Sequence, residues 1–439
     1  MRACKRANAR ACERHHRAAS AELLRQRHHG PGEPRGSRVV SLAAMNLDPS
    51  RIQRDIDDLS PDLREIAARI HANPELRFEE HRAAAWLAEA VEKRGIQVER
   101  GLAGMPTSLR ARIGRGGGPH LAILAEYDAL PEIGHACGHN LIAAGALGAF
   151  LALARQKDAV TGTIDLVGTP AEEGGGGKIR LLEAGAFEGV DAAMMFHPFD
   201  RDLLAHDTLA SAWLELQFRG KPSHAALAPW DGNSALTACL DTFRLIDGQR
   251  VHFRDGVRVH GFIKNGGRAV NIIPELAVAE FSVRALDTEE LARVRAIVER
   301  CARGAAMASG AELTLVDQGG YKNMVNNRKM ARRFGEHLRA LGRSPIEMDP
   351  AVGTGSTDMG DVSHALPAIH PWIAICGKGE TTCHQHAFAE RAASPAGQDS
   401  MLIAAKAMAM TCADLLLDPE LRQGVREEFA QRKAGASAR

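Results

Sequence analysis

Residues 120–155 read "HLAILAEYDALPEIGHACGHNLIAAGALGAFLALAR" and show most clearly how strands and helices follow one another in this chain. A short apolar run, "HLAILA", leads into a turn-rich segment, and "LIAAGALGAFLALAR" then follows as a long apolar run. This pattern predicts a strand, a loop and a buried helix in that order. The loop holds a cysteine and a histidine two positions apart, Cys137 and His139.

The alternation of strands and helices continues along the chain. The predicted strand "GTIDLVGTP" precedes the predicted helix "KIRLLEAGAF", and the strand "VDAAMMFHP" follows. Upstream, residues 52–95 show apolar residues at helical spacing in two blocks, separated by "HANPELRFEE". Near the end of the chain, "SMLIAAKAMAMTCADLLL" predicts a long helix. Such alternation is typical of a mostly parallel sheet that is covered by helices.

The pattern changes near residue 208. The segments "SAWLELQFRG", "VRVHGFIKNG", "LAVAEFSVRA" and "ELTLVDQG" predict strands, and helices are predicted over residues 234–246 and 289–307. The resulting β-α-β-β-α-β order is that of a ferredoxin-like unit. We therefore predict an α/β fold in which a mixed, mostly parallel sheet domain is interrupted by a ferredoxin-like (βαββαβ) domain. The predicted bounds are residues 45–207 and 322–432 for the sheet domain, 208–321 for the inserted domain and 433–439 for a tail.

Composition limits the possible partners. A chain of 439 residues exceeds the ~250–300 residues at which one hydrophobic core stops growing, so two domains are expected. With 55 basic and 54 acidic residues the formal charge is +1, which gives no reason to expect nucleic acid or a membrane surface as a partner. No apolar run approaches the ~20 residues that span a bilayer, so we expect a soluble protein.

Residues 1–44 have an unusual composition, with ten Lys or Arg, four His and few large apolar residues. Such a segment cannot bury enough surface to fold alone. It is a disordered tail, an Arg-rich transit-like segment or the product of an upstream start codon, and we favour the last, with Met45 as the true start. No apolar signal-peptide core is present, so we expect a cytoplasmic protein. The eight cysteines are scattered and do not suggest a disulfide scaffold.

Potential metal ligands follow three successive predicted strands. Cys137 and His139 follow the first strand, Glu172 and Glu173 the second, and His197 ends the third. Metal sites in α/β enzymes lie in loops beyond the carboxyl ends of strands, and thiolate, imidazole and carboxylate are ligands of zinc or manganese. Singly, each residue has an ordinary structural explanation, such as a buried cysteine or a solvated glutamate. Their joint occurrence at three strand ends predicts a metal site.

Two adjacent acids after one strand can divide the work of hydrolysis. One carboxylate can bind metal while its neighbour removes a proton from water, whose pKa a bound ion brings toward ~7. The glycines of "EEGGGGK" also suggest a phosphate-binding loop. However, Lys178 is followed by Ile rather than by Ser or Thr, so the P-loop pattern fails. We interpret these glycines as tight turns beside a crowded metal site.

Seven segments together resemble one known family. They are "HANPEL", "EYDALPEIGHACGHN", "GTPAEEGGGGK", "FHP", "GKPSHAALAPWDGNSA", "IKNGGRAVNIIPE" and "GSTDMGDVSHALPAIHP". In this order, over residues 46–432, they are similar to the M20 metallopeptidase and amidohydrolase family, and nearest to its aminoacylase-1-like group (peptidase M20 domain-containing protein 2). The resemblance implies a catalytic domain interrupted by a lid and dimerisation domain, which agrees with the pattern above.

The resemblance also implies roles for residues of the metal site. Cys137 would bridge two metal ions, Glu172 would be the general base, and the further ligands would be His139, Glu173, His197 and His384. One or two Mn²⁺ or Zn²⁺ ions per subunit are expected. The late ligand departs from the family pattern, because Cys383, His384 and His386 are crowded together, so that His386 or Cys383 could replace His384. Alternatively, Cys376 and Cys383 could form a structural disulfide.

Three more residues are implied to act on the substrate. His224 resembles the lid histidine that reaches a partner subunit's active site and polarises the scissile carbonyl, while Asn271 and Arg284 match positions that grip the substrate. The resemblance thus implies a homodimer or higher homo-oligomer and a small-molecule substrate that bears a carboxylate.

Three functions remain open from the sequence. The first is hydrolysis of a C–N bond in the amide of a dipeptide or of an N-acyl or N-aroyl amino acid. The second is hydrolytic deamination of an aromatic amine such as 5-nitroanthranilate, with release of ammonia. The third is a non-catalytic binding module, against which the presence of Glu172 and of the ligand set argues.

Overall fold

The computed structural model describes residues 47–437, with side chains to residue 433, and all of these belong to one compact unit. The interpretations of residues 1–44 and of Met45 as the start lie outside the described residues.

The first sheet has six strands in the order β1-β2-β4-β3-β5-β11. These strands are β1 (Val98–Arg100), β2 (Leu109–Gly114), β3 (His120–Ala125), β4 (Thr163–Gly168), β5 (Ala192–Met194) and β11 (Ala368–Ile369). β3 runs parallel to β4 and β5, and β5 runs parallel to β11, whereas β1–β2 and β2–β4 are antiparallel. The prediction of a mixed, mostly parallel sheet is confirmed.

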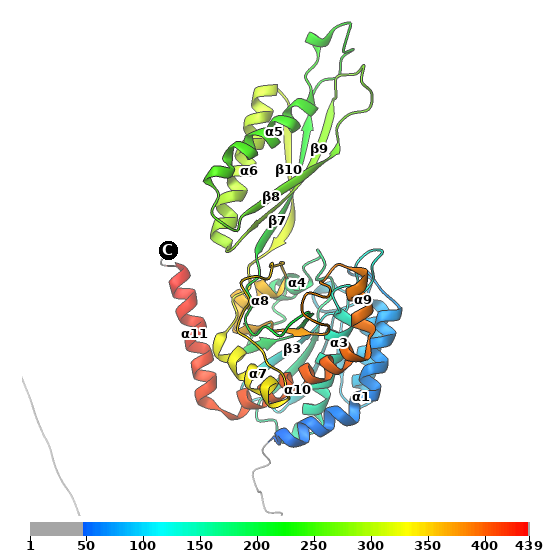
Figure 1. Ribbon diagram of the computed structural model, residues 1–439, viewed down its shortest axis with the longest axis vertical. Helices are drawn as coiled ribbons and strands as arrows, with labels where there is room; N and C mark the ends of the chain where they lie inside the picture. The colour runs from blue at the N-terminus through cyan, green and yellow to red at the C-terminus, as the bar shows by residue number, and fades with distance from the viewer. Residues whose placement is uncertain (1–46, 438–439) are drawn as a thin grey trace, which may run out of the picture. The chain divides into compact units, whose positions relative to one another are not determined.

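Helices cover both faces of this sheet (Figure 1). Leu121 and Ile123 of β3 pack into a core on one face, and Ala122 and Leu124 pack into a core on the other. This is the alternation that a strand buried on both faces requires. The first core includes residues of α1 (Pro49–Ala72), α2 (His81–Glu92), α3 (His139–Ala154), α7 (Arg328–Ala340), α9 (His386–Ala393), α10 (Pro395–Leu417) and α11 (Pro419–Ser437). The second core includes residues of α4 (Gly177–Glu183) and α8 (Met359–Ala365).

The helix α10 corrects one expectation from the sequence. Its 23 residues include a window of mean hydropathy 1.6, so by length and composition it could cross a membrane. The expectation that no apolar segment approaches that length is therefore wrong. However, 78% of the window is buried inside the fold, where α10 packs against α1, α3 and α7. We describe it as a core helix.

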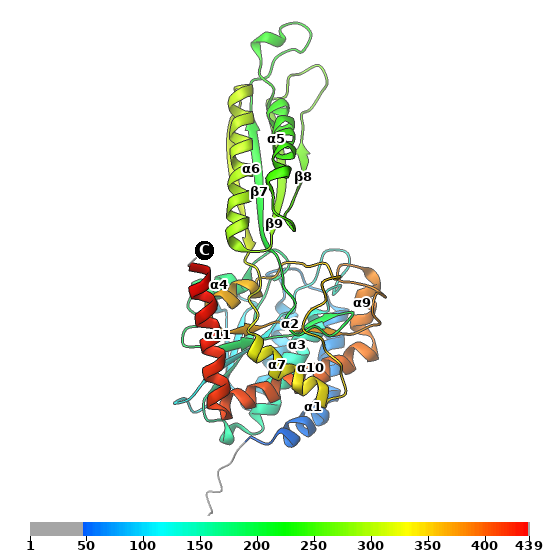
Figure 2. The same ribbon diagram turned by 60° about the vertical axis from the view of Figure 1, so that its left-hand side comes forward.

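The inserted domain forms a sheet of its own. Its elements are β7 (Ala210–Arg219), α5 (Ala235–Gln249), β8 (Arg258–Asn265), β9 (Leu276–Ala285), α6 (Thr288–Ser309) and β10 (Glu312–Tyr321). The strand order is β10-β7-β9-β8 with antiparallel pairs throughout, and α5 and α6 pack together against this sheet (Figure 2). Its apolar core is separate from those of the first sheet. The prediction of a ferredoxin-like βαββαβ unit is confirmed.

Short elements complete the architecture of residues 47–437. A two-stranded parallel sheet joins β6 (His197–Phe199) to β12 (Trp372–Ala374). Single-turn 3₁₀ helices cover Leu102–Gly104, Lys157–Ala159, Pro229–Asp231 and Arg250–His252.

Candidate metal centre

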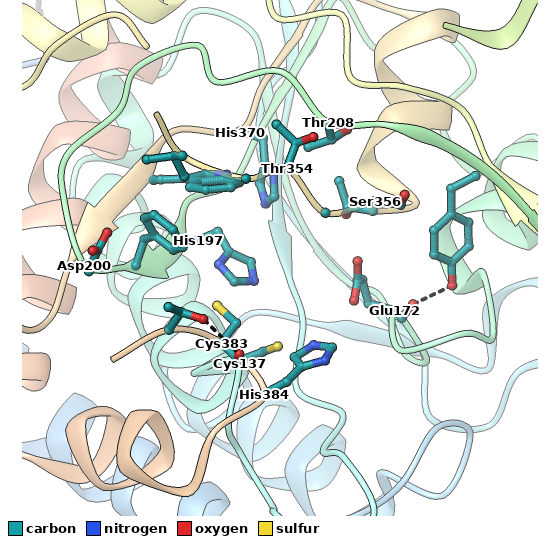
Figure 3. A pocket seen from close by; sticks show the side chains of 18 of the residues that line it. Cys137, Glu172, His197, Asp200, Thr208, Thr354, Ser356, His370, Cys383 and His384 are labelled. Atoms are coloured by element: carbon teal, nitrogen blue, oxygen red, sulfur yellow. Dashed lines mark hydrogen bonds between the residues drawn. The ribbon is translucent and has the colours of Figure 1, made fainter. Parts of the chain in front are cut away.

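A cavity of about 630 Å³ lies where the loops after the parallel strands converge. Its lining includes Cys137, Glu172, His197 and His384, which surround one space in Figure 3. Cys137 comes from the loop after β3, Glu172 from the loop after β4, and His197 begins β6. The loop ends of neighbouring parallel strands meet at one edge of the sheet, which brings together residues that are far apart in the sequence.

The predicted ligands form two donor sets that share one residue. The donor atoms of Cys137, His139 and His197 all lie within 4.8 Å of one another, and so do those of Cys137, Glu173 and His384. One thiolate common to two sets is the arrangement expected of a ligand that bridges two ions. The mixture of sulfur, imidazole and carboxylate donors suits zinc or manganese. The residues present therefore fit the predicted metal centre.

His139 is the most firmly held member of these sets. Gly138 precedes it with a φ of 74°, and a Cβ there would lie 2.8 Å from Pro198, so only glycine allows this entry into α3. The His139 Nδ1 contacts the Asp128 main-chain oxygen at 2.9 Å and its Oδ1 at 3.2 Å. Its Nε2 is buried and has no hydrogen-bond partner, which fits a position reserved for a metal ion.

Neighbouring groups shift the pKa values of His139 and His197 in opposite directions. Burial favours the neutral ring, but the Asp128 carboxylate outweighs it and raises the pKa of His139 well above its usual value. Burial, followed by the charge of His139, lowers the pKa of His197 to about 3, and the Nδ1 of His197 contacts the Pro198 oxygen at 2.7 Å. Both rings are therefore oriented through Nδ1, which leaves Nε2 for the site.

The Glu173 and His384 side chains form the other part of the centre. The His384 Nε2 lies 3.4 Å from the Glu173 Oε1, and the His384 main chain has a φ of 67°, a strained conformation for a residue with a side chain. Hydrogen bonding to Glu173 raises the pKa of His384. His386 is exposed at the start of α9 and belongs to neither donor set, so the structure brings His384 and not His386 to Glu173.

The neighbouring cysteines are not paired with each other. Cys376 and Cys383 both carry free thiols, so the alternative of a structural disulfide between them is wrong. Cys383 lines the cavity next to Cys137, and the hydrogen bond that the Cys137 thiol donates to Cys383, together with burial, raises the pKa of Cys137 well above its usual value. Cys383 belongs to neither donor set.

Glu172 belongs to neither of these two sets, but it forms a third metal-capable set with Glu126 and His139. Its side chain is 8% exposed and lines the cavity, and its carboxylate lies within 4.8 Å of donor atoms of His139 and Glu126. Burial, followed by the charges of Glu126, Glu173 and Asp358, raises the pKa of Glu172 well above its usual value. A buried carboxyl group with a raised pKa is suited to accept and return a proton.

A buried triad of charged residues lies next to Glu172. The Lys178 Nζ lies 2.7 Å from a carboxylate oxygen of Glu126 and 2.7 Å from one of Asp358, and none of the three side chains is exposed. The Lys178 main-chain N–H also donates to Asp358 at 3.0 Å. This lysine is thus committed to two carboxylates, which agrees with the rejection of a phosphate-binding loop.

The three predicted substrate residues fall into two places. Arg284 lies at the end of β9 and lines the cavity. His224 and Asn271 are exposed and do not line it, but they lie together in the inserted domain, where the Ala225 N–H donates to the Asn271 oxygen at 3.0 Å. The structure therefore brings together the ligands, Glu172 and Arg284, and separately His224 and Asn271.

Sequence reasoning missed several polar residues of the site. Glu126 and Asp128 directly follow β3, so the rule that selected Glu172 and Glu173 could have found them. His370 follows β11 in the same way. It is 3% exposed, lines the cavity and packs at 5.5 Å between ring centroids against His197. The role of Lys178 had no signal in the sequence, because its partner Asp358 is 180 positions away.

Comparisons with known proteins identify the family of this chain. Residues 122–412 match the model of peptidase family M20/M25/M40. The chain is 36% identical to the Xaa-Arg dipeptidase of Mus musculus, over 91% of this chain and 95% of that protein. It is 29% identical to a polypeptide of the p-aminobenzoyl-glutamate hydrolase of Escherichia coli, over 84% of this chain and 92% of that polypeptide.

A solved structure shares the fold. A dinuclear metal-binding peptidase of the M20 family from Bacillus subtilis superposes with a TM-score of 0.64 at 22% identity, over 82% of this chain and 99% of that one. Together with the family match and the long alignments, this resolves the family that the sequence motifs suggested. The chain belongs to peptidase family M20/M25/M40 and is an enzyme that hydrolyses C–N bonds.

Proposed function

We propose that this enzyme is a metal-dependent amidohydrolase that cleaves the amide bond of a dipeptide or of an N-acyl or N-aroyl amino acid. The observation that carries the proposal is the position of Glu172, which is buried in the cavity wall beside the two donor sets formed by the predicted ligands. The cavity of about 630 Å³ suits a ligand of this size, since small-molecule sites typically enclose about 300–1,000 Å³. The Xaa-Arg dipeptidase and p-aminobenzoyl-glutamate hydrolase relatives support this substrate class.

The proposed mechanism assigns a task to each group in the cavity. Cys137, His139, Glu173, His197 and His384 would hold one or two Mn²⁺ or Zn²⁺ ions, which when bound supply Lewis-acid activation of water and of the scissile carbonyl. Glu172 takes a proton from the attacking water and delivers it to the leaving amine.

Recognition of the substrate falls to Arg284. Its side chain lines the cavity, and within residues 47–433 it has no carboxylate partner. We propose that it binds the carboxylate of the substrate, because a guanidinium group matches a carboxylate in a two-pronged hydrogen bond.

Replacing the base tests this mechanism directly. Glu172→Gln should retain the metal and lose activity about 10²–10⁴-fold, the usual cost of losing a general base. Glu290→Gln, at a buried carboxylate of the inserted domain, is the matched control and should leave activity unchanged. Normal turnover by a fully metal-loaded Glu172→Gln enzyme would exclude Glu172 from the mechanism.

Product analysis tests the substrate class. Enzyme loaded with manganese or with zinc should release a free amino acid from dipeptides, N-acetyl amino acids or p-aminobenzoyl-glutamate. The same preparation should be given 5-nitroanthranilate. Release of ammonia from that compound, without amide cleavage in the other panel, would establish the deaminase alternative instead.

We also propose that the enzyme is a homodimer in which His224 and Asn271 act in the partner's site. These two residues lie together and do not line the cavity of their own chain. Exposed apolar side chains surround them, with Trp230 78% and Val270 103% exposed. In a dimer, His224 would stabilise the oxyanion that forms at the scissile carbonyl.

Mixed dimers test this arrangement. Inactive His224→Ala and inactive Glu172→Gln subunits, once mixed, should recover part of the activity, because some mixed dimers contain one complete site. No recovery after verified subunit exchange would show that His224 does not act across a dimer.

A further inference from the structure

The last strand of the inserted domain is linked directly to the loop that carries Glu172. Tyr321, one of only two tyrosines in the chain, ends β10 and is 5% exposed. Its hydroxyl donates to the Glu172 main-chain oxygen at 2.5 Å and accepts from the Gly174 N–H at 2.9 Å. The dashed line at Glu172 in Figure 3 marks the first of these bonds.

The other end of this tyrosine is fixed by the inserted domain. Its ring packs edge-on against Trp213 of β7, with 5.3 Å between centroids and an interplanar angle of 86°. The main chain of Tyr321 pairs with that of Ser211, which also belongs to β7, and the Tyr321 N–H donates to the Ser211 Oγ at 3.3 Å. The inserted domain therefore fixes the position of the Tyr321 ring, while the Tyr321 hydroxyl holds the loop that carries Glu172.

The loop around Glu172 is strained and needs such support. Ala171 has a φ of 61°, in the left-handed region that disfavours residues with a side chain. The N–H groups on either side are anchored, that of Ala171 by Glu80 at 2.9 Å and that of Glu173 by Asp128 at 2.9 Å. Within residues 47–433, Tyr321 is the only residue outside the loop that hydrogen-bonds the main chain of Glu172 itself.

Arg284 lies in register with Tyr321 in the sheet of the inserted domain. Ser211 of β7 pairs with Arg284 of β9 on one side and with Tyr321 of β10 on the other. Arg284 and Tyr321 are thus two strands apart, about 10 Å at the usual strand spacing. One rigid element sets the distance between the arginine that lines the cavity and the hydroxyl that holds the Glu172 loop.

We propose that Tyr321 is a positioning residue for Glu172, through which the inserted domain fixes the direction of the general base. This inference rests on the proposed function, since it presumes that Glu172 is the base. Tyr321 also lines the cavity, but within residues 47–433 its hydroxyl hydrogen-bonds only the main chain of this loop, so we infer that it acts on the rate of the reaction through Glu172. Its loss should therefore lower kcat and leave KM and metal content in place.

The other tyrosine provides a matched control. Tyr127 is fully buried, and its hydroxyl also donates to a main-chain oxygen, that of Thr107, at 2.5 Å. Tyr321→Phe and Tyr127→Phe thus remove the same kind of bond from the same kind of residue. We expect kcat to fall about 10–100-fold in Tyr321→Phe, because a small displacement of a catalytic group can cost about 10²-fold. Tyr127→Phe should keep the wild-type kcat.

Each outcome decides the matter. Unchanged kcat in Tyr321→Phe, in an enzyme that Glu172→Gln inactivates, would overturn the inference and leave the proposed function intact. An active Glu172→Gln enzyme would instead refute the proposed function. A raised KM with normal kcat would make Tyr321 a substrate contact. Loss of metal, or failure to fold when Tyr127→Phe folds, would show that the hydroxyl serves the structure and not the base.

Discussion

The two donor sets of the metal centre share Cys137 but are built differently. In the first, His139 is 1% exposed and its ring is held by Asp128, which is itself buried. In the second, the His384 side chain is 57% exposed and lies 3.4 Å from the carboxylate of Glu173, another member of the same set, and its main chain has a φ of 67°. One set is part of the core, and the other is completed by a surface loop.

The two donor sets should therefore bind metal with different strength. A group that hydrogen-bonds a histidine ligand fixes the orientation of the imidazole ring and raises its basicity. Loss of such a group typically costs about 10–100-fold in metal affinity. His139 has this support and His384 does not. We therefore expect a tight ion at the buried set and a weaker, exchangeable ion at the exposed set.

The largest expected effect is at His139. His139→Ala removes a donor from the buried set and leaves the buried Asp128 carboxylate without its imidazole partner. Metal affinity should therefore fall by more than the ~100-fold that the loss of an outer partner can cost. Metal content by elemental analysis and the unfolding midpoint measure the change. His364→Ala, at a half-buried histidine of α8 outside both sets, is the control. Full metal content in His139→Ala would remove this residue from the site.

A smaller and reversible effect is expected at His384. His384→Ala should lose only the weaker ion, so that activity falls but returns when metal is added in excess. Titration of activity against metal concentration would show a shift to higher concentration, smaller than the loss of affinity in His139→Ala. His386→Ala, two positions along and exposed, should behave as wild type. A larger shift in His386→Ala than in His384→Ala would reverse the assignment.

The smallest expected effect is at Asp128. Asp128→Asn keeps an oxygen for the Glu173 N–H and removes only the charge beside His139. Affinity at the buried set should weaken about 10-fold, at the low end for an outer partner, while the exposed set should be unaffected. Calorimetric titration of the metal-free protein can resolve the two sets. An equal loss at both would show that they are not independent.

Much of the fold could be predicted from local patterns. The strand and helix of residues 120–155 and the six elements of the inserted domain were visible because each buries a regular apolar stripe. The apolar length of α10 is harder to recognise, because polar residues interrupt the run although the mean hydropathy of its window is that of an apolar helix.

The site was predictable only in part. Cys137, His139, Glu172, Glu173 and His197 follow strand ends, which local reasoning can recognise. The contacts of Asp128 with His139 and of Tyr321 with Glu172 depend on how segments pack, and no local pattern encodes them. Residues that hold other residues in place are therefore the part of a site that a single sequence hides best.

The buried triad of Lys178, Glu126 and Asp358 has a consequence for the history of the chain. Removing one partner of a buried ion pair typically costs about 3–5 kcal/mol, whereas replacing all of them with well-packed apolar residues can be neutral. Single substitutions at these positions should thus be selected against, although their joint loss is tolerable. Relatives should either carry all three charges or have exchanged them together, so the three positions are expected to co-vary across the family.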